Sequence, residues 1–288
     1  MNIRNNLLKD LKQYYIQDLI SYYDTNEAEQ LLTILIEHYF GISRVKLIMS
    51  PEYRLSESEI LKLHMAVKEL KKYKPVQYIT GEVEFQGLNI RVSKGVLIPR
   101  PETEELVQLI VKKESRTGLS VIDIGTGSGC IAISLYSQLK NPSVFATDIS
   151  VSAIKLANEN AVLNSAEISF IVHDILSGDA LYSKNTFDII VSNPPYVTQE
   201  DKSKMQRNVI DYEPHNALFV PHENPLIFYE AILKCAEIKL KNGGRIYTEI
   251  NESFGSELVN LFNKHNYSEI KLVKDIHHKY RFIYATKK

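Results

Sequence analysis

The chain has 288 residues, of which 44% are hydrophobic, enough to form the cores of one or two domains. Its 34 basic and 35 acidic residues leave a formal net charge of −1, which excludes the overall basic charge typical of nonspecific nucleic-acid binding. The alternative of a local basic patch applies to residues 68–74, although this run is more typical of a solvated helix end, where the helix dipole favours cations.

Two cysteines, Cys130 and Cys235, are too few for a disulfide framework. The first ten residues include Lys9 and Asp10 and do not resemble a secretory signal. No apolar run approaches the ~20 residues that a membrane-spanning helix needs. We therefore expect a soluble, cytoplasmic protein that does not bind membranes.

Residues 1–75 have the pattern of a small helical bundle. Apolar residues recur at helical spacing in three stretches. Gly41 suits the C-terminal cap of the second stretch, and the run from Ser56 to Glu59 is a capping-box pattern that opens the third. Because this region contains no cluster of reactive side chains, we interpret it as a packing or partner-docking domain.

Pro75 ends the third helix, and two short β-like runs follow at 82–85 and 88–92. Gln86 and Gly87 separate these runs, which is typical of a hairpin. We therefore predict a β-hairpin linker over residues 76–97.

The remaining chain, residues 98–288, alternates between strand-like and helix-like stretches. This alternation predicts a doubly wound α/β domain with a mostly parallel sheet. The expected strands are 120–124, 144–147, 169–172, 187–191 and 245–250, with β-like ends at 270–273 and 282–284. The expected helices are 130–139, 153–163, 226–240 and 254–265.

The most informative motif is the run Ser192-Asn193-Pro194-Pro195-Tyr196, which follows an expected strand at the edge where open α/β sheets bind ligands. The Asn193 side chain offers one acceptor and two donors, and the prolines can present backbone carbonyls at little cost in entropy. With the flat ring of Tyr196, these groups can hold a planar amide or aromatic amino group. Two acceptors on its two N–H bonds would turn the nitrogen lone pair toward an electrophile. The alternative is a simple turn, which Asn-Pro also favours.

A second motif runs from a strand residue, Asp123, through three alternating glycines to Cys130. Glycines let the backbone approach a ligand closely, and the following helix start adds N–H donors. Cys130 stands where a dinucleotide fingerprint needs glycine, and no Gly-Lys-Ser/Thr of a P-loop follows. Asp123 suits an ammonium group and would repel a pyrophosphate. The alternatives are a plain turn and, for Cys130, core packing or a reactive thiol.

Two acidic residues follow the next two expected strands. Asp148 is placed to accept two hydrogen bonds from a ribose diol. Together with the glycine loop it fits a nucleoside with an amino-acid tail and no phosphates, which is S-adenosylmethionine. Asp174 is placed to reach the adenine amino group. Two alternatives stay open, because Asp148 could cap the helix that begins after Ser150 and Asp174 could be an ordinary loop residue.

With both motifs, the chain resembles class I S-adenosylmethionine-dependent methyltransferases and, more narrowly, the HemK/PrmC-type release-factor glutamine methyltransferases. The matching segments are residues 75–81, 98–107, 123–129, 193–196 and 212–219. The Asn-Pro-Pro-Tyr tetrapeptide also occurs in adenine-methylating enzymes, whereas the segments starting at 98 and 212 make the narrower match more specific.

Two segments depart from the family pattern. Residues 220–226 differ from its Gly-x-Asp-Gly-Leu-like loop, and Asn251 and Phe254 stand where the family tends to have glycine and a later glutamine. Neither departure removes a proposed catalytic group, but both bear on loop geometry around the pocket.

The resemblance implies a protein-glutamine N5-methyltransferase that acts in translation termination. Its substrate would be the glutamine of the Gly-Gly-Gln motif in class I peptide chain release factors. The implied cofactor contacts are Gly125, Thr126, Gly127, Ser128, Gly129, Asp148 and Ile175, to which our own analysis adds Asp174 and Asn193. The implied substrate contacts are Asn193, Pro194, Pro195 and Tyr196.

We predict that the Asn193 side-chain oxygen and the Pro194 carbonyl accept the two substrate N–H bonds, while Tyr196 packs on the amide plane. Tyr196 could also be a plain packing residue. Arg100 either steers an acidic partner or pairs with Glu102. The scattered histidines indicate no metal site. We expect a monomer without direct nucleic-acid binding.

Two other functions stay open at this point. A nucleic-acid amino-methyltransferase of the adenine N6 type could use the same tetrapeptide, although the near-neutral charge argues against it. A noncatalytic binding protein could keep a degenerate cofactor pocket, although the intact motifs argue against that.

Overall fold

The structure, a computed structural model, describes residues 6–178 and 185–288. It divides into two compact units. The first comprises Met1–Gly81 together with Gln206–Tyr212, and the second comprises Glu82–Met205 together with Glu213–Lys288. The chain therefore passes from one unit to the other three times. No described helix combines the length and the apolar composition needed to cross a membrane.

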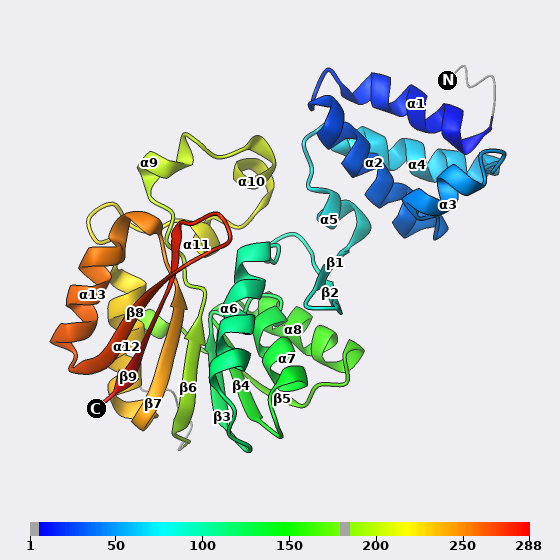
Figure 1. Cartoon of the computed structure of the whole chain (residues 1–288). Helices are drawn as coiled ribbons and strands as arrows, with labels where there is room; N and C mark the ends of the chain where they lie inside the picture. Colours follow the sequence, from blue (N-terminus) through cyan, green and yellow to red (C-terminus); the bar gives the residue numbers. More distant parts are fainter. Residues whose placement is uncertain (1–5, 179–184) are drawn as a thin grey trace. The chain divides into compact units, whose positions relative to one another are not determined.

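The first unit is helical (Figure 1). Its helices are α1 (Leu8–Leu19), α2 (Thr25–Phe40), α3 (Arg44–Met49), α4 (Glu57–Leu70), α5 (Val76–Thr80) and α10 (Arg207–Tyr212). Buried leucines and Tyr15 form its core. Gly41 ends α2 with a left-handed φ of 64°. Ser56 and Glu59 make both hydrogen bonds of the capping box at the start of α4, which confirms this part of the sequence analysis.

Helix α10 belongs to the helical unit although it lies far along the chain. The Arg207 guanidinium stands 4.6 Å from the centre of the Tyr73 ring. The Tyr212 hydroxyl donates a hydrogen bond of 2.9 Å to the Lys72 carbonyl. These two contacts attach an excursion of the later chain to the end of α4.

The expected linker over residues 76–97 is divided between the two units. Its first part is the helix α5, and the hairpin β1 (Glu82–Phe85) and β2 (Leu88–Arg91) belongs to the second unit. Phe85 and Ile90 are fully buried in that unit's core. The Asn160 side chain also binds the Arg91 backbone, accepting from its N–H at 2.8 Å and donating to its carbonyl at 2.9 Å. Apolar burial therefore anchors the hairpin to the second unit.

The second unit is built on a seven-stranded sheet with the order β5-β4-β3-β6-β7-β9-β8. Strands β3 to β7 run parallel, and β9 and β8 are antiparallel at one edge. This arrangement confirms the predicted doubly wound, mostly parallel sheet. The strands are β3 (Ser120–Ile124), β4 (Ser143–Asp148), β5 (Ile168–Val172), β6 (Phe187–Ser192), β7 (Leu240–Glu249), β8 (Tyr267–Lys274) and β9 (Tyr280–Lys287).

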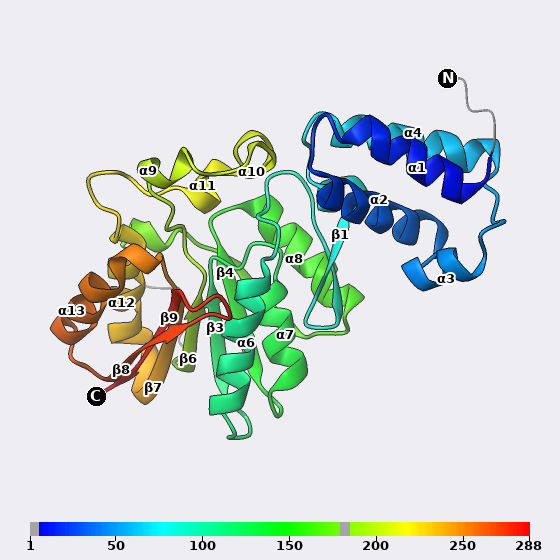
Figure 2. The same cartoon turned by 45° about the horizontal axis from the view of Figure 1, so that its top comes forward.

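Helices cover both faces of this sheet (Figure 2). Alternate residues of β3 point to opposite faces, so that Val121 joins one apolar core while Ile122 and Ile124 join the other. The first core contains α6 (Pro101–Lys113), α7 (Cys130–Gln138) and α8 (Val151–Leu163), and the second contains α12 (Ile227–Lys239) and α13 (Gly255–Lys264). The short elements are η1 (Ile175–Ser177), α9 (Gln199–Lys202), α11 (His215–Leu218) and η2 (Glu252–Phe254).

The strand order reverses between β3 and β6, because the chain continues from β3 to β4 and β5 on one side and resumes with β6 on the other. The loops after β3 and β6 diverge at this point, and open α/β sheets bind ligands in the resulting crevice. The Ser192 hydroxyl donates to the Ile124 carbonyl at 2.6 Å and joins the two strand ends.

Gly129 should be intolerant of a side chain. Its φ is +83°, and an added Cβ would lie 3.1 Å from Ala157 Cβ. Gly129→Ala should therefore lower the free energy of unfolding by about 2–5 kcal/mol through backbone strain and overpacking. Gly118→Ala is the matched control, since φ is +73° there but no atom lies within 4 Å of the added Cβ. Equal losses in urea unfolding of the two variants would contradict a steric role for Gly129.

Candidate cofactor and substrate site

A pocket of about 250 Å³ lies at the C-terminal edge of the sheet. The loops after β3, β4, β5 and β6 all contribute to its wall. Most of the predicted site residues line it together: Gly125, Thr126, Gly127, Ser128, Asp148, Asp174, Ile175, Asn193, Pro194 and Pro195. Gly129 and Tyr196 lie outside this lining. The two motifs that are separated by more than sixty residues in the sequence therefore meet in one cavity.

The glycine loop after β3 is held by Asp148 at the end of β4. Asp148 Oδ2 accepts from the Gly127 N–H at 2.9 Å, and Oδ1 accepts from the Ser150 N–H at 2.9 Å. Ser150 itself caps α8 by accepting from the Ala153 N–H. The alternative that Asp148 is the helix cap is therefore wrong. Its carboxylate lines the pocket and keeps acceptor capacity for a ligand.

Asp123 is fully buried beneath the glycine loop. Its Oδ2 accepts a hydrogen bond of 2.6 Å from the Thr126 hydroxyl. Desolvation nevertheless raises the pKa of Asp123 to about 7, and the neighbouring charge of Asp148 adds to this rise. A carboxyl group in this state is stabilised as an anion when a cation approaches.

Asp174 caps the short helix η1 by accepting from the Leu176 N–H at 2.9 Å. It also lines the pocket beside Ile175. The alternative of an ordinary loop residue thus gives way to a local structural role at the pocket wall. Contact between Asp174 and an adenine amino group stays a prediction.

Asn193 follows β6 and takes part in a network of buried hydrogen bonds. Its Nδ2 donates to Thr103 Oγ1 at 3.1 Å, and the Thr103 hydroxyl donates to Glu249 Oε2 at 2.8 Å. The Tyr196 hydroxyl donates to the other carboxylate oxygen, Glu249 Oε1, at 2.7 Å. Burial and the neighbouring Glu249 raise the pKa of Tyr196 well above its usual value, so its hydroxyl remains a donor.

Thr103 and Glu249 were missed in the sequence analysis as site residues. Thr103 stands in a segment that matches the family, and Glu249 is an acidic residue at the C-terminal end of an expected strand. Both positions therefore carried a signal, but only the fold shows that they converge on Asn193.

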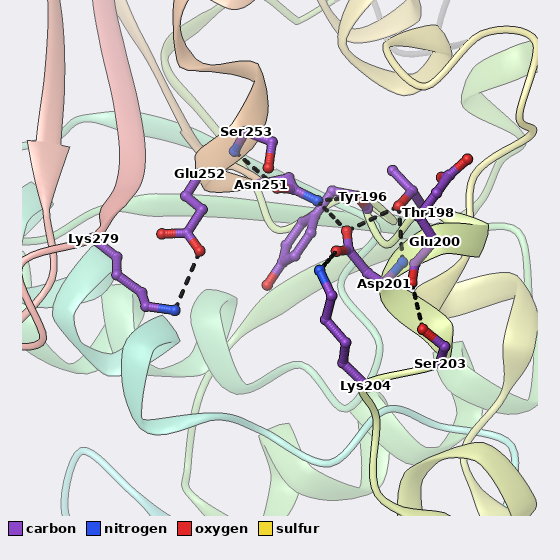
Figure 3. Close-up of polar contacts among 10 residues, drawn as sticks. All are labelled: Tyr196, Thr198, Glu200, Asp201, Ser203, Lys204, Asn251, Glu252, Ser253 and Lys279. Carbon is purple, nitrogen blue, oxygen red and sulfur yellow. Dashed lines mark hydrogen bonds and ion pairs between the residues drawn. The ribbon is translucent and has the colours of Figure 1, made fainter.

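Asn251, which we expected to affect the loop geometry around the pocket, holds the backbone of the tetrapeptide. Its Nδ2 donates to the Tyr196 carbonyl at 3.2 Å and to Asp201 Oδ2 at 3.0 Å, as Figure 3 shows. Its Oδ1 accepts from the Ser253 N–H at 3.0 Å. Thr198 also donates to Asp201, at 2.9 Å. Asn251 thus supplies a cross-link between the ends of β6 and β7.

Arg100 pairs with Glu213 at 2.6 Å, so the alternative that it pairs with Glu102 is wrong. The Glu213 carboxylate is almost completely buried and also accepts from the Ile98 N–H at 3.2 Å. A buried carboxylate without a partner would be costly, which explains why Arg100 pairs with the distant Glu213 rather than with the less buried Glu102. Arg100 also lines the pocket.

Cys130 is buried at the start of α7. Desolvation raises the pKa of its thiol to about 12. The thiolate form is therefore suppressed, and of the two alternatives core packing is confirmed.

Sequence comparisons agree with this geometry. Residues 12–81 match the PrmC N-terminal domain and residues 101–216 match the Methyltransferase small domain. A release factor glutamine methyltransferase of Flavobacterium psychrophilum is 44% identical over 281 residues, which cover 96% of this chain and 98% of that protein. The chain belongs to the release factor glutamine methyltransferase family. A second member, from Bacteroides thetaiotaomicron, is 41% identical over 95% of this chain and 98% of its own length.

The fold is also found among solved methyltransferases. A 16S rRNA N2 G1207 methyltransferase of T. thermophilus, in complex with AdoMet and guanosine, is 18% identical to this family member. The two match with a TM-score of 0.52 over 72% of this chain and 50% of that chain. This likeness concerns the fold.

The chemistry of the pocket fits S-adenosylmethionine. Its charged lining residues are Asp148, Asp174 and Arg100, of which Arg100 is already paired with Glu213. Within the described part of the chain, two lining carboxylates thus face no unpaired arginine or lysine, which suits a cationic sulfonium nucleoside and would repel a pyrophosphate. The apolar lining, such as Ile175, suits the flat face of a base.

The raised pKa of Asp123 should make the stability of the ligand-free protein depend on pH. Because the folded pKa is about 7 against an unfolded value of 3.8, the contribution is complete below about pH 4 and is lost as pH rises through 7. The loss is at most about 4 kcal/mol. Asp123→Asn stays neutral and should flatten this part of the pH profile of chemical denaturation. Identical profiles for the variant and the parent would contradict the assignment.

Proposed function

We propose that this protein transfers a methyl group from S-adenosylmethionine to the side-chain amide nitrogen, N5, of the glutamine in the Gly-Gly-Gln motif of class I peptide chain release factors. One observation carries the proposal: Asn193 and Pro194 line the same pocket as the glycine loop and Asp148. An amide held by the tetrapeptide therefore meets a methyl donor held by the loop. The full-length relatives named release factor glutamine methyltransferases support this substrate.

The chain's own residues would hold the cofactor along the pocket wall. Among the residues that line the pocket, the backbone of 125–128 would approach the cofactor closely, Asp148 would accept from its ribose, and Asp174 and Ile175 would border its adenine. When bound, S-adenosylmethionine supplies an electrophilic methyl group on a sulfonium. Gly129 contributes by allowing the close packing of α7 on α8 that shapes the loop.

Asn193 and Pro194 orient the substrate amide. The Asn193 side-chain oxygen and the Pro194 carbonyl accept the two N–H bonds, which turns the nitrogen lone pair toward the methyl group. Positioning of this kind can lower a barrier by about 7–11 kcal/mol. No strong base is needed before transfer, because the methylated nitrogen is acidic and readily loses a proton. Pro195 lines the pocket and excludes water from the amide, while Tyr196 lies outside the lining and holds this segment through its hydroxyl bond to Glu249.

We further propose that the helical unit is a docking domain for the release factor and that residues 82–288 outside α10 form the catalytic domain. Three apolar side chains of α3 are largely exposed and support a protein-binding role: Val45, Ile48 and Met49 are 65%, 73% and 77% exposed. A role in translation termination implies a cytoplasmic protein, and we propose that it acts as a monomer without direct nucleic-acid binding.

No observation favours the alternative of a nucleic-acid amino-methyltransferase. The densest basic run is largely neutralised, because Lys71 pairs with Asp18 at 2.8 Å and Lys72 pairs with Glu69 at 2.5 Å. Glu69 also lies 3.7 Å from Lys74. This run would attract a phosphate backbone only weakly.

The proposed reaction can be tested with labelled S-adenosylmethionine. Purified class I release factor should be methylated, while its Gly-Gly-Ala variant and a DNA duplex should remain unlabelled. Label on the variant factor would contradict the acceptor residue, and label on DNA would contradict the substrate class.

Asn193→Ala should remove one of the two acceptors for the substrate amide. The single-turnover rate should fall by the equivalent of about 3–4 kcal/mol, the scale of a preorganised polar contact. Asn158→Ala is a matched control, because the Asn158 side chain is exposed and, among the described residues, bonds only the Ile154 carbonyl of its own helix. An unchanged rate in Asn193→Ala would refute the role of Asn193.

A further inference from the structure

The hydrogen-bond network of Asn193 joins three residues from three parts of the catalytic unit. Thr103 lies in the first turn of α6, Asn193 directly follows β6, and Glu249 ends β7. Thr103 is 2% exposed and Glu249 is 1% exposed, so water does not compete for their hydrogen bonds. Parallel pairing of Ser192 with Thr248 brings the ends of β6 and β7 together.

The hydroxyl and amide hydrogens available in this network determine which way the Asn193 amide faces. An ionised carboxylate can only accept, so the single hydroxyl hydrogen of Thr103 is donated to Glu249 Oε2. Thr103 Oγ1 is then left as an acceptor. The atom of Asn193 that faces it at 3.1 Å must be a donor, which is Nδ2. The Asn193 Oδ1 has no hydrogen-bond partner among the described residues and is available to a ligand in the pocket.

The hydroxyl groups around Glu249 support its acceptor role. Burial raises the pKa of the Glu249 carboxyl and the charge of Glu102 adds to the rise, while the hydrogen bonds from Tyr196 and Thr103 and the charge of Arg281 oppose part of it. Both carboxylate oxygens are engaged by hydroxyls, Oε1 by Tyr196 and Oε2 by Thr103. One carboxylate therefore fixes both polar ends of the tetrapeptide.

We propose that Glu249 and Thr103 are positioning residues that set the orientation of the Asn193 amide, with Oδ1 toward the substrate. This inference rests on the proposed function of Asn193. If the amide turned over, it would present an NH2 group to the two N–H bonds of the substrate, and donor would meet donor. We call the hydrogen bonds from Asn193 to Thr103 and from Thr103 to Glu249 the relay. The relay excludes the unproductive orientation, which an isolated asparagine side chain adopts about as readily as the productive one.

Thr103→Val tests the relay because valine keeps the shape of threonine but lacks the hydroxyl. Without it, the Asn193 NH2 loses its acceptor, and kcat for release-factor methylation should fall about tenfold or more. The KM for the release factor should stay unchanged. Thr103→Ser retains the hydroxyl and should restore most of kcat. Glu249→Gln has a single acceptor oxygen for two hydroxyls and should also lower kcat.

A readout without turnover separates this inference from the proposed function. In nuclear magnetic resonance spectra, the Asn193 side-chain NH2 should exchange slowly with water in the parent protein and in Thr103→Ser, and rapidly in Thr103→Val. If the parent protein failed to methylate release factors, the proposed function would fail, while slow exchange would still decide whether the relay exists.

The control is Tyr229→Phe, which removes a 3.0 Å hydrogen bond to the backbone carbonyl of Glu249 and leaves the carboxylate untouched. It should lower thermal stability without a change in kcat. Slow exchange of the Asn193 NH2 in Thr103→Val would overturn the relay. Equal losses of kcat in Thr103→Val and Thr103→Ser, or a matching loss in Tyr229→Phe, would indicate a packing role and would also overturn it.

Discussion

Desolvation of carboxylates is the constraint on which the catalytic unit depends. Asp123, Glu213 and Glu249 are all buried around the pocket, and a buried charge is tolerated only with compensating partners. Glu213 and Glu249 gather donors from distant parts of the chain, whereas Asp123 accepts from the nearby Thr126. Glu213 binds Arg100 and the Ile98 backbone, and Glu249 binds Thr103 and Tyr196. The need to satisfy these groups brings the loops of the site into a defined arrangement.

Asn251 shows how a single side chain can join several loops of a site. A glycine at this position could not reach the Tyr196 carbonyl, whereas the asparagine amide bonds to that carbonyl and to Asp201. The extra polar group is satisfied on both sides, because its oxygen caps the start of η2. Asn251 thus cross-links the segments that follow β6 and β7.

The fold could be predicted where local patterns decide the structure. Apolar periodicity located β3 and β6 almost to the residue, since buried parallel strands are short apolar runs. Strand β7 begins at Leu240 rather than at the expected 245, because Leu240, which was expected at the end of a helix, pairs with Phe187. Tertiary pairing outweighed local propensity there.

The contacts of the site were less predictable than its elements. Thr103 is 90 residues from Asn193 and 146 residues from Glu249 along the chain. No periodicity links such positions, and only the sheet order makes them neighbours. The attachment of α10 to the helical unit has the same origin, since a stacked arginine leaves no mark on local sequence patterns.

Tyr212 and Glu213 are consecutive residues that belong to different units. The hydroxyl of one is bonded to Lys72, and the carboxylate of the other holds the arginine that lines the pocket. Their Cα atoms are separated by the fixed length of one peptide unit, about 3.8 Å. A truncated protein that began at the hairpin would lack Lys72, so the Tyr212 hydroxyl next to Glu213 would lose its hydrogen-bond partner. The two units thus have separate cores, but the chain joins them directly at Tyr212 and Glu213.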